Sequence, residues 1–375
     1  MPKVAADRDE SFFRASVNEL SPYQPGRPIE HVQREHGLDR VVKLASNEGP
    51  FGPLPAALEA MAQAAAGLNR YPDGGAYTLH HALAERHGVA VAEVCAGAGA
   101  DGCIDCLSQA ILDPGDEIVC GWPSFPSYVI YARKQGAHAH LVPLRDHRYD
   151  LDALAEAITP RTKIAYICHP NNPTGTANTT DELDAWFERV PGRVITVVDQ
   201  AYFEYIDRDD YPDAIERYFK DGRDVVVLRT FSKIYGLAGQ RIGYAVGPEP
   251  VIAAMTKVRR PFDLTTTAQV AALASIDGGA EIERRRAVNA EGLARLMEIL
   301  TAHGLEPAGP ALGNFLYVEV GDGRDVFERL LREGVIVRPL AGFGAPEAIR
   351  ITVGAPDELD VLDAALGHVL SGVSI

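Results

Sequence analysis

The sequence predicts an α/β protein with a mainly parallel sheet, helices on both faces of that sheet, and a second, smaller α/β domain. Through the middle of the chain, short strands rich in Val and Ile alternate with helical patterns, which is typical of parallel sheets covered by helices. A separate block of strands and helices follows a long helical stretch. The strands expected in the main sheet are Glu93–Ala96, Glu117–Cys120, Ala139–Val142, Lys163–Ile167, Val194–Val198, Val225–Leu228 and Ile242–Val246.

Helices are expected where apolar residues recur at helical spacing. Between the strands these are Asp101–Leu112, Ser124–Gln135, Leu151–Ile158 and Thr180–Val190. From about Thr265 to His303 the chain is expected to be helical, with a break at Gly278-Gly279. The last block combines the strands Phe315–Val320, Val335–Val337 and Ile349–Val353 with the helices Gly323–Glu333 and Pro356–Val369. We expect a large domain over 50–285 and a small domain over 1–49 and 286–375, which includes an amino-terminal arm.

The composition is that of a globular protein with an acidic surface. Its 375 residues are 46% hydrophobic and 23% charged, enough for one large domain and a smaller one. A formal net charge of −16 argues against nucleic acid or an anionic membrane as partner, because both attract basic surfaces. No apolar run reaches the length of a membrane span, and residues 1–14 lack a signal-peptide core. We therefore expect a cytoplasmic protein.

The five cysteines do not predict a metal site. Cys103 and Cys106 form a Cys-x-x-Cys pair, but a zinc site needs a second ligand pair at suitable spacing, and the sequence shows none. Both cysteines fall in the expected helix 101–112. We interpret them as packing residues in a reducing compartment.

Glycine-rich and polar segments follow the expected strands at their carboxyl ends, where parallel α/β sheets bind ligands. The first of them, Gly97 to Gly102, spells Gly-x-Gly-x-x-Gly. A dinucleotide-binding fold would place an acidic residue at the end of the next strand, which instead ends in Gly121-Trp122. The loop is thus weak evidence for an NAD-dependent oxidoreductase. It does predict backbone N–H groups at a helix start that can hold one phosphate.

A lysine lies at the mouth of the expected sheet. The apolar run Val225–Leu228 continues into Arg229-Thr230-Phe231-Ser232-Lys233, and Arg241 follows eight residues later. Burial of an ammonium is costly and lowers its pKa, which frees the amine for covalent chemistry. For Lys233 taken alone, a side chain that reaches from the strand end into water is the simpler interpretation.

Three more side chains at strand ends favour a functional role for Lys233 over simple exposure to water. Asp199 closes the apolar strand Ile195–Val198, where a carboxylate needs a cationic or hydrogen-bonding partner. Asn172 lies in the turn sequence Asn-Asn-Pro-Thr-Gly, and Tyr202 follows Asp199. A structural hydrogen bond, a turn and a packed aromatic ring would explain each one singly. Together with Lys233 they complement a single ligand.

On these residues the chain resembles the fold-type I pyridoxal-phosphate aminotransferases, and within them the histidinol-phosphate aminotransferase family. The resemblance spans nearly the whole length. It is carried by Leu20–Gln24, Lys43–Glu48, Arg70–Gly74, the Asn172 and Asp199 loops, Thr230–Arg241, Asn314-Phe315, Val335–Leu340 and Ile349–Gly354. It implies the three-layer αβα PLP-dependent transferase fold, pyridoxal 5′-phosphate (PLP) as the cofactor, and a homodimer with shared active sites.

The resemblance also implies how PLP is held. Lys233 would bond covalently to the cofactor and then shuttle protons, Asp199 would pair with the pyridine nitrogen, and Tyr202 would complete the catalytic set. Asn172 and Tyr202 would hydrogen-bond the phenolic oxygen of the ring. Phe125 would stack on the ring face. The implied phosphate ligands are the backbone of Gly99, Ala100 and Asp101, the hydroxyls of Thr230 and Ser232, the guanidinium of Arg241 and, from a second subunit, Tyr71.

The substrate contacts implied in the same way are Tyr23, Asn47, Arg338 and Arg350. Arg350 resembles the arginine that clamps an amino acid's carboxylate, which suits its planar fork of donors. Histidinol phosphate has no carboxylate, so one or both arginines would meet its phosphate. The chain departs from the family pattern at Gly49, where many relatives have Asn, and at Arg260–Thr265, a segment expected near the substrate.

The expected reaction converts L-histidinol phosphate and 2-oxoglutarate to imidazole acetol phosphate and L-glutamate, a step of histidine biosynthesis. Because of those departures, an aromatic amino-acid aminotransferase on the same fold stays open as the first alternative. A PLP-dependent decarboxylase of a phosphorylated amino acid shares the Lys/Asp/Arg set and is the second. The NAD-dependent oxidoreductase rests only on the glycine loop.

Overall fold

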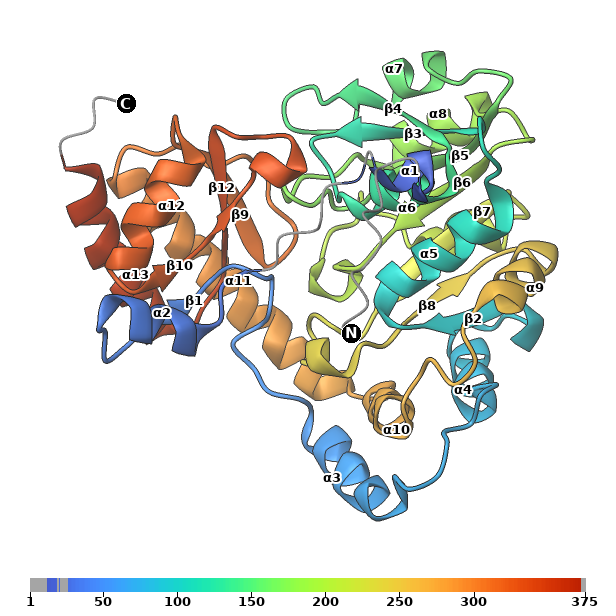
Figure 1. The fold of residues 1–375 in the computed structure, drawn as a ribbon, viewed down its shortest axis with the longest axis horizontal. Helices are drawn as coiled ribbons and strands as arrows, with labels where there is room; N and C mark the ends of the chain where they lie inside the picture. Colours follow the sequence, from blue (N-terminus) through green and yellow to red (C-terminus); the bar gives the residue numbers. More distant parts are fainter. Residues whose placement is uncertain (1–11, 19, 21–25, 372–375) are drawn as a thin grey trace, which may run out of the picture.

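A computed structural model describes residues 12–18, 20 and 26–371, and its central feature is a seven-stranded sheet (Figure 1). The strand order is β2-β8-β7-β6-β5-β3-β4. The strands are β2 (Val94–Gly97), β3 (Glu117–Trp122), β4 (His138–Pro143), β5 (Thr162–Cys168), β6 (Ile195–Asp199), β7 (Val225–Thr230) and β8 (Gly243–Val246). Strands β3 to β7 pair in parallel, and β8 is antiparallel to both of its neighbours. The mainly parallel sheet expected from the sequence is confirmed.

Helices cover the two faces of this sheet, which gives three layers (Figure 1). The helices packed around it are α3 (Pro55–Ala64), α4 (Tyr77–His87), α5 (Gly99–Ile111), α6 (Ser127–Gln135), α7 (Leu151–Glu156), α8 (Thr180–Arg189), α9 (Glu249–Val258) and α10 (Thr266–Ser275). Local sequence sets their ends. For example, the Thr179 hydroxyl accepts from the Glu182 N–H while the Glu182 carboxylate accepts from the Thr179 N–H, a capping box that starts α8.

The interior strands β5, β6 and β7 are buried along nearly all of their length. Their Val, Ile and Leu side chains form the main hydrophobic core with the inner faces of the helices. Such unbroken apolar runs are what a parallel sheet covered on both sides requires. Because water is excluded from the strands themselves, polar chemistry gathers at their carboxyl ends.

A second group of strands lies beside the first (Figure 1). Its three-stranded antiparallel sheet has the order β11-β12-β9, and a parallel pair joins β1 to β10. The strands are β1 (Val42–Lys43), β9 (Phe315–Glu319), β10 (Val335–Ile336), β11 (Arg338–Pro339) and β12 (Ala348–Thr352). The helices beside them are α2 (Ile29–His36), α12 (Gly323–Arg332) and α13 (Pro356–Leu370), whereas α1 (Ala15–Asn18) lies against α6 of the main sheet.

Helix α11 (Gly279–Ala302) connects the two larger hydrophobic cores. Ile282, near its start, packs in the core of the seven-stranded sheet, whereas Leu296, Ile299 and Leu300 pack in the second core. The expected division between residues 285 and 286 falls inside this helix. Short turns of 3-10 or π type complete the chain at Ala65–Gly67, Val91–Glu93, Phe203–Tyr205, Ile215–Phe219, Ala238–Gln240 and Ala341–Phe343.

Several of these elements were not expected from the sequence, namely α1, α2, α3, α4, α9, β1 and β11. The helix expected over Ser124–Gln135 begins three residues later, at Ser127. Among the helices of the described residues, none has the length and apolar character to cross a membrane.

Candidate active site

The side chains singled out in the sequence meet at the carboxyl edge of the main sheet. Asp199 is the last residue of β6, and Asn172 follows the neighbouring strand β5. Lys233 lies in the turn after β7, and helix α5 starts at Gly99 directly after β2. Loops from four strands therefore converge on one region, as the topology of a parallel sheet predicts.

Asp199 presents a buried carboxylate to this region. Its Oδ2 accepts a hydrogen bond of 2.7 Å from the Tyr128 hydroxyl, and its Oδ1 accepts one of 3.1 Å from the Ala201 N–H. Both donors are uncharged, so burial dominates and raises the pKa of Asp199, against the two hydrogen bonds and the charge of Lys233. A cation placed against this carboxylate would relieve that cost.

The amine of Lys233 loses its proton near neutral pH, far below the ordinary lysine range. Burial is the largest cause, the nearby charge of Arg350 is the next, and together they lower the pKa of Lys233 to about 7. Its Nζ donates to the carbonyl of Ser46 at 3.3 Å and lies 5.6 Å from the centre of the Tyr202 ring. A neutral primary amine among polar side chains is a nucleophile and a base.

A further cluster, here called the cradle, is suited to bind a dianion. It consists of Arg241, Ser232, Thr230 and the start of α5 at Gly99. Arg241 donates to the Ser232 hydroxyl and to the Ala98 carbonyl, both at 3.3 Å, and the Thr230 hydroxyl lies 3.0 Å from that of Ser232. Gly99 has a φ of 75°, and a Cβ there would come within 2.5 Å of the Arg241 guanidinium, so only glycine fits. Helix α5 begins at this glycine, next to the Arg241 guanidinium, and the first N–H groups of a helix have no partner within it.

The Asp101 side chain faces away from that cradle. Its two carboxylate oxygens accept hydrogen bonds from Ser127, at 2.5 Å, and from Tyr131, at 2.6 Å, on helix α6. The backbone of Ala100 and Asp101 stays in the first turn of α5, where the sequence analysis expected phosphate contacts. The carboxylate itself fixes α5 against α6.

Arg350 brings the second sheet to the site. It lies on β12, is buried, and donates through Nη1 to Oδ1 of Asn172 and through Nη2 to the carbonyl of Ala45 at 2.8 Å. Phe315 and Phe343 flank its guanidinium, each ring centre within 5.4 Å. The guanidinium is therefore held in a fixed orientation next to the Asn172 loop.

The remaining predicted residues differ in where they lie. Phe125 is partly buried and its ring lies edge-on to that of Tyr128, 5.6 Å away, so it borders the site next to Asp199. Tyr202 and Asn47 are joined by a hydrogen bond of 2.8 Å inside it. Arg338 is paired in register with Arg350, on the adjacent strand β11. Tyr71 is 81% exposed and stacks on Phe262, and Tyr23 lies outside the described residues.

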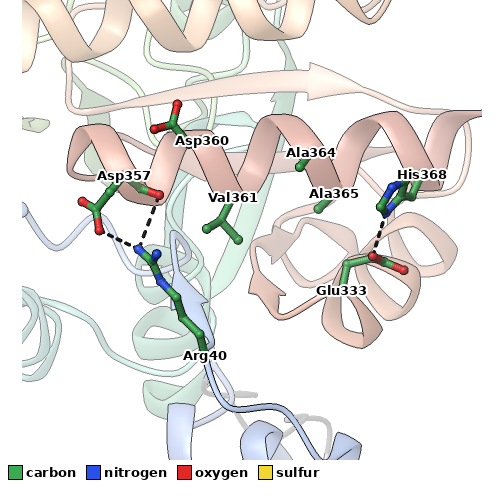
Figure 2. A pocket seen from close by; sticks show the side chains of 8 residues that line it. All are labelled: Arg40, Glu333, Asp357, Asp360, Val361, Ala364, Ala365 and His368. Carbon is green, nitrogen blue, oxygen red and sulfur yellow. Dashed lines mark hydrogen bonds and ion pairs between the residues drawn. The ribbon is translucent and has the colours of Figure 1, made fainter.

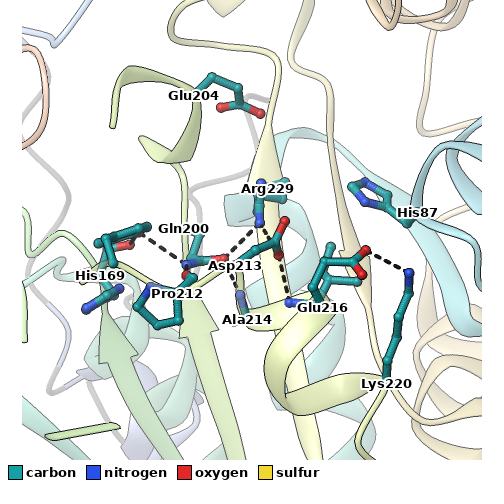
Figure 3. Close-up of polar contacts among 12 residues, drawn as sticks. His87, His169, Gln200, Glu204, Pro212, Asp213, Ala214, Glu216, Lys220 and Arg229 are labelled. Atoms are coloured by element: carbon teal, nitrogen blue, oxygen red, sulfur yellow. Dashed lines mark hydrogen bonds and ion pairs between the residues drawn. The ribbon is translucent and has the colours of Figure 1, made fainter. Parts of the chain in front are cut away.

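The sequence analysis missed a buried polar cluster just beyond Asp199 (Figure 3). Arg229 of β7 is only 2% exposed, donates at 2.9 Å to both Gln200 and Asp213, and lies 3.4 Å from the centre of the Phe203 ring. Gln200 in turn donates to Tyr211 and to the carbonyl of Pro212. The sequence feature that could have predicted this cluster is Arg229, a cation that directly follows the apolar run Val225–Leu228. Tyr128, the donor to Asp199, was also missed, because tyrosine in a helix reads as an ordinary core residue.

A groove along α13 is a weaker candidate (Figure 2). Its polar side chains already have partners: Arg40 pairs with Asp357 at 2.5 Å, His368 lies 3.0 Å from Glu333, and Asp360 pairs with Arg295. Asp357 and His368 are largely exposed, and the groove contains none of the residues described above. Nothing in it resembles a reactive centre.

The residues at the carboxyl edge of the main sheet fit PLP. The buried Asp199 carboxylate, served only by neutral donors, suits a protonated pyridine nitrogen. The neutral Lys233 amine suits an aldehyde, and the Arg241, Thr230, Ser232 and α5 cradle suits a phosphate. The fit rests on three separate functional groups of the cofactor.

Comparison with known proteins gives the same result. The family model "Aminotransferase class I and II" matches residues 39–366. Histidinol-phosphate aminotransferases are similar along nearly their whole length: that of Akkermansia muciniphila is 45% identical over 93% of this chain and 96% of its own, and that of Moorella thermoacetica 42% identical over 96% and 93%.

Solved structures of this family share the fold. The histidinol-phosphate aminotransferase of Sinorhizobium meliloti, in complex with pyridoxal 5′-phosphate, superposes with a TM-score of 0.86 at 30% identity, over 96% of this chain and 98% of its own. An aspartate aminotransferase of Thermus thermophilus with maleate gives 0.79 at 26% identity, over 96% and 98%. The fold-type I architecture expected from the sequence is confirmed. The chain belongs to the class I and II aminotransferases, enzymes that depend on PLP.

Proposed function

We propose that the enzyme transfers the amino group of L-histidinol phosphate to 2-oxoglutarate, giving imidazole acetol phosphate and L-glutamate. The observation that carries the reaction class is the Lys233 amine, with its pKa lowered to about 7, beside the buried carboxylate of Asp199. The choice of substrate is supported by identities of 42% and 45% to enzymes of that name over nearly the whole chain. The reaction belongs to histidine biosynthesis.

PLP, when bound, supplies an electron-poor ring that weakens the bond between the substrate's reacting carbon and its hydrogen. Lys233 holds the cofactor, and its amine then takes that proton and returns it later in the cycle. A base with a pKa of about 7 is suited to both tasks near neutral pH, because it gains and loses a proton with little cost.

Asp199 and Tyr202 set the electronic state of the ring. The Asp199 carboxylate, fixed by Tyr128 and Ala201, keeps the pyridine nitrogen protonated by pairing with it. Asn172 and Tyr202 would hydrogen-bond the phenolic oxygen of the ring. The phosphate is held by Arg241, by the Thr230 and Ser232 hydroxyls and by the first N–H groups of α5.

Arg350 is proposed as the main anchor of the substrate. Its orientation is fixed by Asn172 and Ala45, so it presents a rigid fork toward an anion. The phosphate of histidinol phosphate and a carboxylate of 2-oxoglutarate can occupy this position in turn, with Arg338 from the neighbouring strand close by. Tyr23 is proposed as a further substrate contact on its resemblance alone.

The active enzyme is proposed to be a cytoplasmic homodimer with a large domain over 50–285 and a small domain over 1–49 and 286–375, and without nucleic-acid or membrane partners. The exposed Tyr71 ring supports the dimer, because it is free to contact a second subunit and resembles the tyrosine that reaches the partner's phosphate site in the family. If the enzyme in solution had the molecular mass of a monomer, the proposed homodimer would be wrong.

Turnover measurements with 2-oxoglutarate as amino acceptor test the substrate. We expect histidinol phosphate to give a much higher kcat/KM than phenylalanine or aspartate. A large preference for phenylalanine would make the enzyme an aromatic amino-acid aminotransferase instead. Release of carbon dioxide without consumption of 2-oxoglutarate would make it a decarboxylase. A colourless protein that binds NADH would contradict the PLP chemistry altogether.

A further inference from the structure

The segment Ala45–Asn47 crosses the candidate site, and each of its three carbonyls accepts a hydrogen bond from a polar side chain. Arg350 donates to Ala45 at 2.8 Å, Lys233 to Ser46 at 3.3 Å, and Asn314 to Asn47 at 3.0 Å. The segment thus contacts groups from both sheets. Its own side chains are in a position to influence the reacting residues.

Asn47 is the residue of this segment with the most constrained surroundings. It is 1% exposed and has a φ of 54°, a left-handed conformation that asparagine tolerates better than most residues. Its N–H donates to the Thr352 hydroxyl at 3.0 Å, and its side-chain Oδ1 lies 3.1 Å from the same hydroxyl. Its Nδ2 lies 2.8 Å from the hydroxyl of Tyr202.

These contacts fix which way the Asn47 amide faces. Thr352 already accepts from the Asn47 N–H, so its own hydrogen needs an acceptor, and among the described residues its hydroxyl is paired only with Asn47. Thr352 is 2% exposed, so leaving that hydrogen without a partner would be costly. The side-chain oxygen of Asn47 must therefore face Thr352, and the NH2 group must face Tyr202.

The consequence is that Tyr202 accepts from Asn47 and keeps its own hydrogen for another partner. We propose that Asn47 and Thr352 are positioning residues that fix the direction of the Tyr202 hydrogen bond, so that Tyr202 donates to the phenolic oxygen of PLP. This inference rests on the proposed function only in taking PLP as the ligand. Strand β12 then carries both the substrate anchor Arg350 and, two residues later, the origin of this hydrogen-bond chain.

The proposed chain has a measurable effect on Lys233. A hydrogen bond donated to the phenolic oxygen stabilises its anionic form and weakens the attraction between that oxygen and a proton on Nζ of the cofactor-bound lysine. Loss of the donor raises the pH at which Nζ gives up its proton. That pH is read from the visible absorbance of the PLP-loaded enzyme, without substrate or turnover.

The variant Asn47→Asp reverses the chain. A carboxylate oxygen in place of Nδ2 accepts the Tyr202 hydrogen and turns the hydroxyl away from the cofactor. We expect the midpoint of the absorbance titration to rise by about one pH unit or more, since a charge-assisted hydrogen bond is lost. Thr352→Val, which frees the Asn47 amide to rotate, should give a smaller rise, and Thr352→Ser should restore the wild-type midpoint.

The double variant Asn47→Asp/Tyr202→Phe separates the hydrogen bond from the added charge. Without the Tyr202 hydroxyl, only the charge effect is left, so the shift caused by Asn47→Asp should shrink by at least half when Tyr202→Phe is already present. An equal shift with and without the Tyr202 hydroxyl, or no shift when that hydroxyl is present, would overturn the proposal.

If the Asn47→Asp variant does not fold, the comparison of Thr352→Val with Thr352→Ser decides instead, because identical midpoints for the two would equally overturn the proposal. A protein with normal PLP absorbance but no activity on histidinol phosphate would contradict the proposed substrate and leave this test intact.

Discussion

Two cations, Arg229 and Lys233, lie four residues apart at the end of the same strand, and their surroundings are opposite. Arg229 is buried and its charge is compensated: Nη2 donates to the carboxylate of Asp213 and to the amide oxygen of Gln200 (Figure 3). Its guanidinium also lies over the face of Phe203. Among the described residues, Lys233 donates to a single neutral acceptor, the carbonyl of Ser46. The protein compensates the charge of Arg229, whereas no carboxylate of the described residues contacts Lys233 directly, and Lys233 loses its proton readily.

The loop after β6 serves both stability and reactivity through two neighbouring residues, Gln200 and Asp199. Gln200 follows Asp199 directly, so the Arg229 cluster anchors the chain immediately beyond the carboxylate that faces the cofactor. A charge-paired buried arginine is expensive to disrupt but chemically inert. A buried lysine without such a partner is reactive because the protein does not stabilise its charged form.

The largest effect is expected for Lys233→Ala. Transamination should fall by several orders of magnitude, because the covalent attachment and the proton transfers depend on the same amine. The fold and noncovalent PLP binding should persist, as seen by circular dichroism and equilibrium dialysis. Lys233→Arg is the matched control: it keeps a cation and should be equally inactive. Activity near that of the wild type in either variant would break the comparison.

Arg229→Met should destabilise the protein while leaving PLP attached to Lys233. Removing one member of a buried pair leaves Asp213 uncompensated, and we expect the free energy of unfolding in urea to fall by about 3 kcal/mol. The estimate is at the low end for such pairs because the Asp213 side chain is 27% exposed. Arg189→Met, which breaks an ion pair with Asp152 that is exposed on both sides, should have much less effect. Similar losses in the two variants would show that Arg229 is not specially placed.

The lowered pKa of Lys233 predicts how the cofactor-free protein reacts with PLP. Only the neutral amine attacks an aldehyde, so the attachment rate should rise about tenfold per pH unit below pH 7 and level off above it. Between about pH 7 and the ordinary lysine value of 10.5 the unfolded chain binds more protons at this residue than the folded one, so the stability of the cofactor-free protein should rise with pH there. A rate that keeps rising to pH 10 would mean that Lys233 is an ordinary amine.

Tyr128→Phe should have the smallest effect. It removes the hydroxyl that donates to Asp199 and leaves the ring in place, which should lower turnover about tenfold, in proportion to one buried hydrogen bond. Tyr166→Phe is the matched control, since its ring stacks on Tyr128 at 4.4 Å but its hydroxyl lies near Ser108 rather than Asp199. Equal effects of the two changes would assign the loss to packing.

The strands of the main sheet and the residues at their ends were predictable because both have local signals. A Val- and Ile-rich run marks a buried strand, and a polar residue at its end stands out against it, as Asp199 does. The Arg229 cluster was not predictable, because its partners Gln200 and Asp213 come from a separate loop, and only the folded chain brings them to β7. Asn47 stays a predicted substrate contact, but its hydrogen bonds to Tyr202 and Thr352 were not predictable, because these residues are 155 and 305 positions away in the sequence.

Reduction of the PLP-loaded enzyme with borohydride, followed by peptide mass spectrometry, tests the central claim most directly. The account predicts a single pyridoxyl label on the peptide that carries Lys233, and none on the Lys233→Arg variant. A label on another lysine, or the absence of any label from a protein that contains PLP, would contradict it.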